Sequence, residues 1–322
     1  PSTEVASSTT EAPEGNQPST ANPTESSTGP TSTNAEPTTT SAAPTTSAPP
    51  ATLAPGETAC TPYRSISSAG LVASPDLVEA SGMAASRTQP GVVWAHNDSR
   101  DGARVYAIGS TGEDLGGFGI TGASAFDWED MAAGPGTDGR TSSLYLGDIG
   151  DNFSIRGGLT TVYRVAEPDP ITHTGPIEGT TVLEFAYPDG TYNAEAMFVD
   201  GDSIYIVTKD REEARVYRGS TTPTDSRTET LELITVLSLG AEVSGADMSW
   251  DGATLAFRGY QSVWLWHRAP GATIAETLTT DPCEAPSPDE VQGEAITFLA
   301  DGAYSTVSEG TNPDLFVVPR DA

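Results

Sequence analysis

Short hydrophobic runs separated by turn residues dominate the chain after residue 64. The runs are rich in Val, Tyr, Leu and Thr, and they end at Asp-Gly, Pro-Asp-Gly or Gly-Ser. This alternation is typical of antiparallel hairpins. Helical periodicity is not sustained anywhere along the chain. The pattern therefore predicts an all-β fold.

One short phrase recurs five times, and it ends in a methionine or isoleucine followed by one more residue. The copies are Ala-Ser-Gly-Met-Ala (80–84), Trp-Glu-Asp-Met-Ala (128–132), Ala-Glu-Ala-Met-Phe (194–198), Gly-Ala-Asp-Met-Ser (245–249) and Gly-Glu-Ala-Ile-Thr (293–297). Aligned on Met83, Met131, Met197, Met248 and Ile296, they are 48, 66, 51 and 48 residues apart. A strand-rich unit repeating at 40–50 residues is the signature of a β-propeller blade.

Each phrase is followed by two more strand-like runs. The second runs are VVWAHND, LYLGDIGD, IYIVTKD, LAFRGY and YSTVSEG, and the third are RVYAI, TVYRV, RVYRG, VWLWH and LFVVP. Weaker fourth runs such as TVLEFAY and LELITVL complete a four-stranded blade. The fifth unit has only three runs before Ala322, so we expect residues 63–72 to supply its last strand and close the ring. This count predicts five blades, with six as the alternative if the long step or residues 61–80 hide a degenerate blade.

The first 58 residues differ in composition from the rest. Ser, Thr and Pro fill 31 of the first 50 positions, which hold no Trp, Tyr, Phe, Ile, Leu, Lys or Arg. Such a stretch cannot bury enough apolar surface to offset its backbone entropy. We expect residues 1–58 to be a disordered, Pro-stiffened tether and residues 59–322 to be the propeller domain.

Two cysteines stand near the two ends of the predicted propeller. Neither Cys60 nor Cys283 lies in a metal-binding spacing, so a disulfide that clasps the ends is one expectation and two buried thiols are the other. No apolar run is long enough to span a membrane. Tether and disulfide together suggest an exported protein, extracellular or associated with the cell surface, with any anchor upstream of Pro1. We expect it to be a monomer.

The charge limits the possible partners. The net charge is −30, and Lys209 is the only lysine. Nucleic acid and anionic membranes are bound through Lys and Arg, so neither is an expected partner. An acidic surface can serve solubility alone, but it is also compatible with divalent cations.

The repeated phrases also carry a family resemblance. DWEDMA, LYLGDIGDN, YNAEAMF, IYIVTKD, QGEAITF and TVSEG resemble phrases of a group of exported bacterial β-propeller proteins, from about residue 60 to the end. More loosely, the chain is similar to calcium-dependent propellers of the phytase, gluconolactonase and paraoxonase type. The resemblance implies the propeller fold and leaves the activity open.

Acidic residues precede the repeated methionine or isoleucine in four of the five phrases. In a propeller the first strand of each blade lines a central channel, so these acids would converge around one axis. The acids expected there are Glu129, Asp130, Glu195, Asp247 and Glu294. Close carboxylates raise one another's pKa unless a cation compensates them. Oxygen-only ligands favour Ca²⁺.

Internal ion pairs are the alternative to a metal. The second runs end in residues that could serve as charge partners, namely Lys209, Arg258 and Glu309. In this alternative, the two basic side chains pair with the acids and leave no room for a cation.

Two other stretches have two interpretations each. In DIGDN, Asp148 and Asp151 could be calcium ligands, or they could cap turns with their own side chains. His96 could be a general base, or it could be a packed or turn histidine.

The sequence holds no complete catalytic motif. We favour a tethered propeller that binds a small-molecule or cell-surface ligand near a Ca²⁺ site. The alternative is a calcium-dependent hydrolase of an ester, lactone or phosphoester, with His96 or Glu129 as general base.

Overall fold

In a computed structural model of the chain, residues 52–98, 101–222 and 227–321 are described below. Backbone contacts divide the chain into two units, residues 1–45 and residues 46–322, and only the second contains described residues. The predicted tether lies mostly outside the described residues. Its last part, residues 52–58, is exposed, and burial begins at Ala59.

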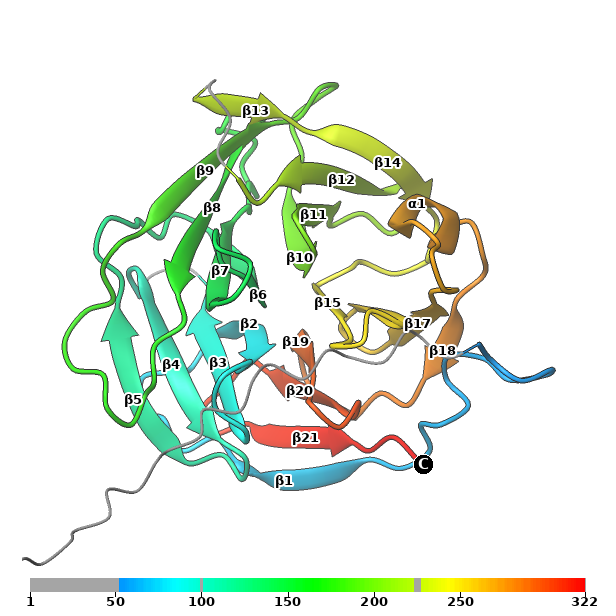
Figure 1. Ribbon diagram of the computed structural model, residues 1–322, viewed down its shortest axis with the longest axis horizontal. Helices are drawn as coiled ribbons and strands as arrows, with labels where there is room; N and C mark the ends of the chain where they lie inside the picture. The colour runs from blue at the N-terminus through cyan, green and yellow to red at the C-terminus, as the bar shows by residue number, and fades with distance from the viewer. Residues whose placement is uncertain (1–51, 99–100, 223–226, 322) are drawn as a thin grey trace, which may run out of the picture. The chain divides into compact units, whose positions relative to one another are not determined.

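Five antiparallel sheets stand around a common axis, as a β-propeller (Figure 1). Blade 1 contains β2 (Ala80–Ala85), β3 (Val92–Asn97), β4 (Arg104–Gly109) and β5 (Asp114–Gly119). Blade 2 contains β6 (Trp128–Pro135), β7 (Ser142–Asp148), β8 (Leu159–Ala166) and β9 (Thr181–Ala186). Blade 3 contains β10 (Ala194–Asp200), β11 (Ser203–Thr208), β12 (Ala214–Ser220) and β14 (Glu232–Leu237).

Blade 4 contains β15 (Gly245–Met248), β16 (Thr254–Arg258), β17 (Val263–His267) and β18 (Cys283–Ala285). Blade 5 contains β19 (Gly293–Phe298), β20 (Tyr304–Ser308) and β21 (Asp314–Val318), and β1 (Ser67–Leu71) adds its outer strand. A short strand, β13 (Thr228–Thr230), leaves blade 3 and pairs in parallel with β9 of blade 2. One four-residue helix, α1 (Ile274–Thr277), joins β17 to β18. The count of five is therefore confirmed.

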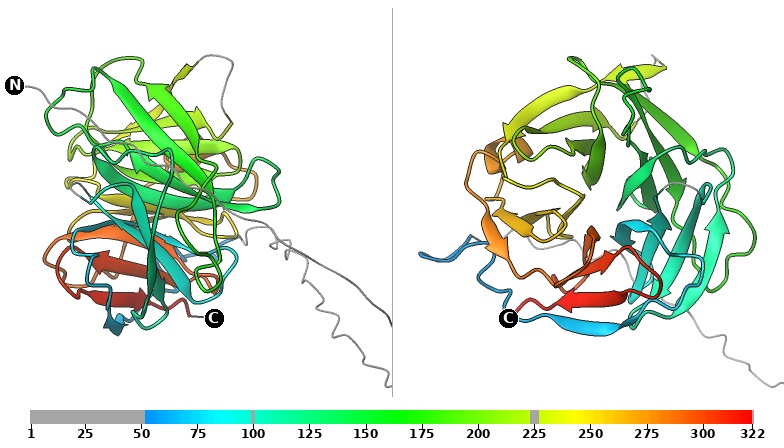
Figure 2. Two further views of the ribbon diagram at one scale, coloured as in Figure 1. Left: turned by 90° about the vertical axis from the view of Figure 1, so that its left-hand side faces the viewer. Right: turned by 180° about the vertical axis from the view of Figure 1, so that it is seen from behind.

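The ring closes as the sequence predicted. β1 pairs antiparallel with β21, with Ser67 opposite Val317, so the two ends of the propeller share one sheet (Figures 1 and 2). Cys60 and Cys283 form the disulfide, with their Cα atoms 6.0 Å apart. The bond ties the segment before β1 to β18, so it joins the closing strand's leader to blade 4 instead of reinforcing blade 5 itself.

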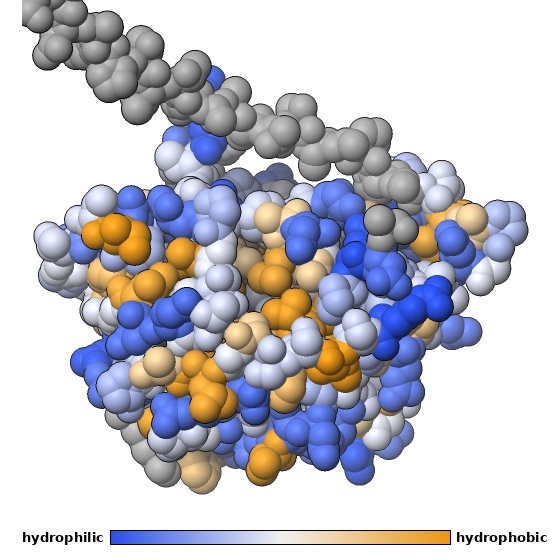
Figure 3. Space-filling model, turned by 90° about the horizontal axis from the view of Figure 1, so that it is seen from below, coloured by the Kyte–Doolittle hydropathy of each residue, from blue (hydrophilic) through white to orange (hydrophobic). Residues whose placement is uncertain are grey.

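The core consists of five apolar clusters, one between each pair of neighbouring blades. The methionine or isoleucine of each repeated phrase packs toward the preceding blade: Met131 lies with Trp94 of blade 1, and Met197 lies with Tyr145 of blade 2. Met83, Met248 and Ile296 occupy the corresponding clusters. The repeated residue is thus an inter-blade packing residue, as its recurrence suggested. On the outer surface, hydrophobic residues occur in small patches among hydrophilic ones (Figure 3).

No helix in the described part of the chain is both long and apolar enough to cross a membrane.

Candidate functional site

The inner strands β2, β6, β10, β15 and β19 all begin at one end of the ring, which we call the carboxylate end. Because neighbouring strands are antiparallel, the second strands finish at this same end. Asp98, Lys209 and Glu309 are equivalent there, since each backbone N–H donates to the residue just before an inner strand. The carboxylate end therefore combines side chains from two strands of each blade.

A β-bulge turns one residue of the inner strand out of register in four of the five blades. The breaks in pairing leave Ser81, Glu129, Glu195 and Glu294 as the bulged residues. A bulge redirects a side chain that would otherwise follow the pleat. β15 has no bulge, and Ala246 occupies the corresponding position. Three glutamates and one serine are thus placed by the same local device.

The next position along the strand has a different role. Asp130 is fully buried, and its carboxylate accepts hydrogen bonds from the amides of Met131, Met197 and Ala246 at 2.8–3.0 Å. One side chain therefore links the inner strands of blades 2, 3 and 4. Burial raises the pKa of Asp130 well above its ordinary value, although the three backbone donors act in the opposite direction.

Asp247 links the inner strands of blades 4 and 5 in a similar way. Its carboxylate accepts from the amides of Met248 and Phe298 and from the Thr297 hydroxyl. The five acids expected to converge as one set therefore divide into two. Asp130 and Asp247 connect inner strands, whereas Glu129, Glu195 and Glu294 occupy the bulges.

The bulge glutamates of blades 3 and 5 have hydrogen-bond donors. In blade 3, Asn193 Nδ2 donates to Glu195 Oε1 at 3.1 Å, and Lys209 Nζ lies 2.6 Å from Glu195 Oε2. In blade 5, Gln292 Nε2 donates to Glu294 Oε1 at 2.9 Å. In both blades an Asn or Gln stands two residues before the glutamate, and we call this sequence amide-x-Glu. Its side-chain amide donates a hydrogen bond to the buried carboxylate of the same strand.

Blade 2 has the same spacing with a different residue. Asp127 stands two residues before Glu129, and a carboxylate cannot donate a hydrogen bond when ionised. Glu129 is 5 % exposed, and its Oε1 has no hydrogen-bond partner among the described residues. One oxygen each from Asp98, Asp127 and Glu129 lies within 4.8 Å of the other two. These three carboxylates, which we call the blade 2 group although Asp98 follows β3 of blade 1, are all acceptors, whereas blades 3 and 5 pair a donor with an acceptor.

Burial and mutual repulsion both raise the pKa values at this end. The pKa of Glu129 is raised first by burial and then by the charges of Glu195, Asp98 and Asp127, with Lys209 acting against them. Burial also raises the pKa of Asp127, against the nearby Arg156. Because each of these shifts opposes ionisation, a cation near the carboxylates would lower their pKa values.

The pKa of Glu294 is raised to about 8, chiefly by burial and then by the Glu195 charge, against the hydrogen bond from Gln292. Burial alone would lower the pKa of Lys209, but its contacts with Glu195 and Tyr260 raise it instead.

Gly150 shapes the blade 2 group. A Cβ atom at this position would lie 2.2 Å from Glu129 Oε1 and 2.5 Å from Asp127 Oδ2. The Gly150 amide also donates to the Asp127 carbonyl. Only glycine leaves both carboxylates in these positions.

The other residues singled out from the sequence lie elsewhere. Asp148 accepts from the amides of Phe126 and Asp127 and pairs with Arg156, while Asp151 accepts from the amides of Ile155 and Arg156. Asp151 thus caps the turn after β7, as the turn-capping alternative expects, whereas Asp148 joins the residues before β6 to Arg156 of that turn.

His96 is fully buried, and its ring packs edge to face against Trp128. This placement matches the packed-histidine alternative.

The charge partners behave differently from one another. Lys209 pairs with a bulge glutamate, as the ion-pair alternative required. Arg258 does not pair with the acids of the inner strands, because its fully buried guanidinium binds Glu290. Glu309 is half-buried, and burial and the Glu79 charge raise its pKa against Lys209. Lys209 therefore compensates Glu195, and Arg258 compensates Glu290 away from the inner-strand acids.

Neither Asp127 nor Asp98 was assigned to a site from the sequence. The sequence signal that could have identified Asp127 is the residue two positions before each bulge glutamate. This residue is Asp127 in blade 2, Asn193 in blade 3 and Gln292 in blade 5. That comparison requires knowing which residue is bulged.

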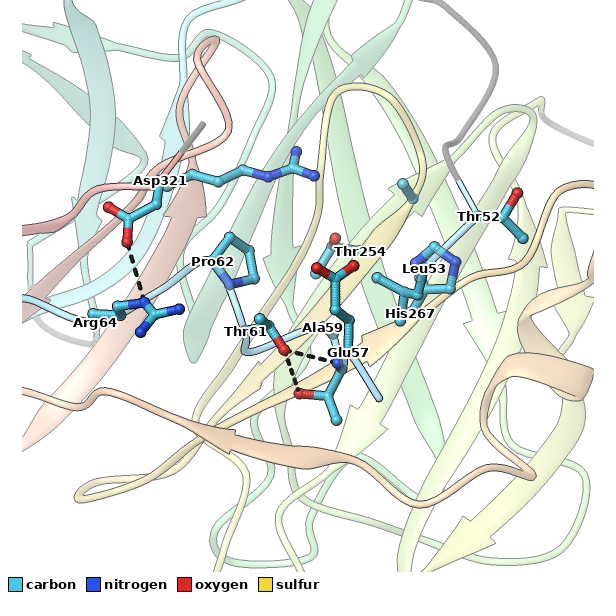
Figure 4. Close-up of a pocket in the computed structure, with 13 residues that line it drawn as sticks. Thr52, Leu53, Glu57, Ala59, Thr61, Pro62, Arg64, Thr254, His267 and Asp321 are labelled. Atoms are coloured by element: carbon cyan, nitrogen blue, oxygen red, sulfur yellow. Dashed lines mark hydrogen bonds and ion pairs between the residues drawn. The ribbon is translucent and has the colours of Figure 1, made fainter. Parts of the chain in front are cut away.

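A cavity of about 300 Å³ lies apart from this site, beside the disulfide. Its lining includes Leu53, Arg64, His267 and Asp321, and Arg64 points toward Asp321 at 3.3 Å (Figure 4). None of the residues expected to form the site lines it.

The chain matches no protein-family model and no curated protein sequence. Solved structures similar to it include the PQQ-bound aldose sugar dehydrogenase of Streptomyces coelicolor, with 11 % identity over 79 % of this chain and 98 % of that one, and a TM-score of 0.45. A gluconolactonase from Xanthomonas campestris has 14 % identity over 79 % of each chain and a TM-score of 0.44. A glucose dehydrogenase has 9 % identity over 80 % of this chain and all of that chain, with a TM-score of 0.47. Likenesses at this level carry no argument about the function of this protein.

Proposed function

We propose that the protein is an exported β-propeller that binds a ligand at the carboxylate end through a Ca²⁺ ion held by Asp98, Asp127 and Glu129. The observation that supports this most directly is the buried Glu129 Oε1, which accepts no hydrogen bond from the described residues and faces two further carboxylates. A buried charged oxygen left without a partner costs several kcal/mol, so a cation in this place would remove a real penalty.

The donor set fits calcium. All three ligands are carboxylates, which hard cations prefer, and no cysteine is free to attract a softer metal. Oxygens bound to one Ca²⁺ lie 2.3–2.6 Å from it, so two of them are at most about 5 Å apart. The 4.8 Å limit among these oxygens satisfies that condition. Calcium takes six to eight ligands, so three protein ligands would leave positions for a bound molecule and water.

Export also belongs to this proposal. A disulfide between Cys60 and Cys283 is stable in an oxidising compartment, and the Ser, Thr and Pro-rich segment before it would hold the propeller away from a surface.

The decisive test exchanges the blade 2 residue for its blade 3 counterpart. Ca²⁺ that binds only the folded protein stabilises it by RT ln(1 + [L]/Kd), which is about 2.7 kcal/mol at 100 times the Kd. In D127N this stabilisation should disappear, and the cation-free variant should be at least as stable as the cation-free wild type, because the new amide can donate to Glu129. Thermal melting with Ca²⁺ and with chelator measures both quantities.

D281N is the matched control, since Asp281 is exposed in the loop between β17 and β18 at the opposite end of the ring. It should respond to Ca²⁺ as the wild type does. A wild-type melting temperature that is the same in Ca²⁺ and in chelator would refute the cation site.

A hydrolase is the second candidate, and one observation favours it. Glu294, with a pKa of about 8, keeps its proton at neutral pH, and its charge interactions connect it with Glu195 and Lys209. A protonated carboxyl group near a cation-bound ester or lactone would act as a general acid. Ca²⁺-dependent hydrolysis of a lactone that is lost in E294Q, with Ca²⁺ affinity unchanged, would support this function over binding alone.

A further inference from the structure

The apolar side chains beside the blade 2 carboxylates point to the kind of ligand. Phe126 directly precedes Asp127 and is 54 % exposed, and Phe153 is 84 % exposed. Large apolar side chains with such exposure on a fold with a complete core are candidates for contact with a ligand. Both are at the carboxylate end, because Phe126 lies just before an inner strand and Phe153 lies just after a second strand.

Hydrogen bonds hold the Phe153 loop against the candidate cation ligands. The Asn152 amide lowers the pKa of Asp127 by donating to its carboxylate, and the Asp151 amide donates to Asn193 Oδ1 at 2.6 Å. Asn193 Nδ2 lies 3.2 Å from Asn152 Oδ1. The segment that carries Phe153 is therefore tied both to the blade 2 group and to the amide-x-Glu sequence of blade 3.

The Phe126 ring is also held in place. The Arg156 guanidinium lies 4.6 Å from its centroid, and Arg156 is itself paired with Asp148. An aromatic ring supported from one side in this way is a stacking surface with a fixed position. Phe126 directly precedes Asp127, a candidate cation ligand, in the chain.

The charge of this end excludes a negatively charged ligand. Beyond the three proposed cation ligands it carries Glu195 and Glu309, and Lys209 pairs with Glu195. A ligand carboxylate or phosphate placed among these carboxylates would be repelled by those that are ionised. The same acids can accept hydrogen bonds from hydroxyl groups.

We propose that the ligand is a neutral carbohydrate whose neighbouring hydroxyl groups complete the coordination of the Ca²⁺ ion and whose apolar C–H face rests on Phe153 and Phe126. This inference rests on the proposed cation site. Sugar hydroxyls are hard oxygen ligands for Ca²⁺, they donate to carboxylates such as Glu195, and the C–H face of a pyranose ring packs on aromatic rings. A neutral carbohydrate meets all three requirements of this end of the ring in one molecule.

The test uses the full chain and a panel of neutral and uronic-acid-containing oligosaccharides, immobilised and probed with Ca²⁺ or with chelator. We expect retention on one or more neutral glycans that is lost in chelator. The best neutral glycan is then titrated in solution against wild type, F153A and I171A. Ile171 is 72 % exposed in the loop between β8 and β9, at the opposite end of the ring, so I171A is the matched control.

F153A should lower the affinity for the glycan at least tenfold and leave the affinity for Ca²⁺ within twofold of wild type. I171A should change neither affinity. Calcium binding without retention on any neutral glycan would overturn this inference and leave the cation site standing. Preference for acidic glycans, retention that persists in chelator, or equal affinities in F153A and I171A would also overturn it. Absence of calcium binding would refute the proposed function itself.

Discussion

Blades 2 and 3 begin their inner strands with the same β-bulge and a shared Glu-x-Met sequence, yet they leave their buried glutamates in opposite states. In blade 3, Asn193 and Lys209 supply two donors to Glu195. In blade 2, Asp127 takes the place of the asparagine, and Glu129 Oε1 lacks a donor among the described residues. The fold therefore tolerates a buried glutamate in either state, and one side chain decides whether it is satisfied internally or available to a cation.

The equivalent residues of the second strands follow the same division. Lys209 in blade 3 corresponds to Asp98 in blade 1, whose carboxylate belongs to the blade 2 group. A lysine and an aspartate at equivalent positions thus give neighbouring parts of the ring opposite charges. This difference is what makes one part a closed ion pair and the other a candidate metal centre.

The largest effect should come from breaking the blade 3 pair. K209M leaves Glu195 buried without its cation, which should lower the free energy of unfolding by about 3 kcal/mol. Urea unfolding measures the change. The double variant K209M/E195Q should recover most of the loss, because the neutral amide needs no counter-charge.

R227M is the control for this prediction, since the Arg227–Glu184 pair is exposed and should contribute less than about 1 kcal/mol. A K209M variant as stable as R227M would show that blade 3 does not depend on its ion pair.

The next largest effect tests the space beside the blade 2 carboxylates. G150A would place a Cβ 2.2 Å from Glu129 Oε1, so both carboxylates must move. We expect a loss of about 1–3 kcal/mol, typical of overpacking, together with loss of the Ca²⁺-dependent rise in melting temperature.

G119A provides the comparison for this variant, because a Cβ at Gly119 has its nearest neighbour at 4.0 Å. It should keep the calcium response. If G150A kept that response as well, the arrangement of Glu129 and Asp127 would not be the source of cation binding.

A smaller effect should follow from converting blade 3 to the blade 2 pattern. N193D removes the donor to Glu195 and adds a carboxylate, so we expect a loss of about 1–2 kcal/mol in unfolding measured with chelator. Q292E in blade 5 should behave similarly, because Gln292 serves Glu294 in the same way. Unchanged stability in both variants would mean that the amide-x-Glu sequence is not what stabilises the buried glutamates.

A separate effect, spread over several pH units, is a dependence of the stability on pH. The pKa of Glu294 is about 8 in the folded protein against an ordinary value of 4.5, so the folded state holds a proton that the unfolded state releases between these values. The stability that Glu294 contributes is therefore fully present below pH 4.5 and is lost as the pH rises to about 8, with a slope of at most about 1.4 kcal/mol per pH unit.

Unfolding of wild type and E294Q from pH 5 to pH 8 measures this contribution as the difference between the two curves. The other buried acids act with the same sign in both proteins, so they cancel in the difference. Parallel curves would contradict the raised pKa.

Hydrophobic patterning predicted the fold correctly because each blade repeats the same packing problem. The recurring Met or Ile marks the inner strand since it must fill the space between two blades, and Met131 and Ile296 do so in separate clusters. The missing last strand of blade 5 pointed to residues 63–72, and the disulfide was one of the two expectations for the cysteines. The roles of the acids were harder to predict. The repeat pattern groups all acids that precede the Met or Ile, although neighbours such as Glu129 and Asp130 have different environments in the structure.

The sequence by itself determined the five-bladed ring, its closure by β1 and the acidic character of one end, because these depend on periodicity and composition. Only the tertiary structure decided what each acid does. A one-residue bulge separates Glu129 from the inter-strand hydrogen bonds of Asp130, and the packing of blade 1 against blade 2 brings Asp98 close to Asp127. The first depends on a local break in strand register, and the second depends on a contact between two blades. Neither a bulge nor a contact between blades produces a periodic signal in the sequence.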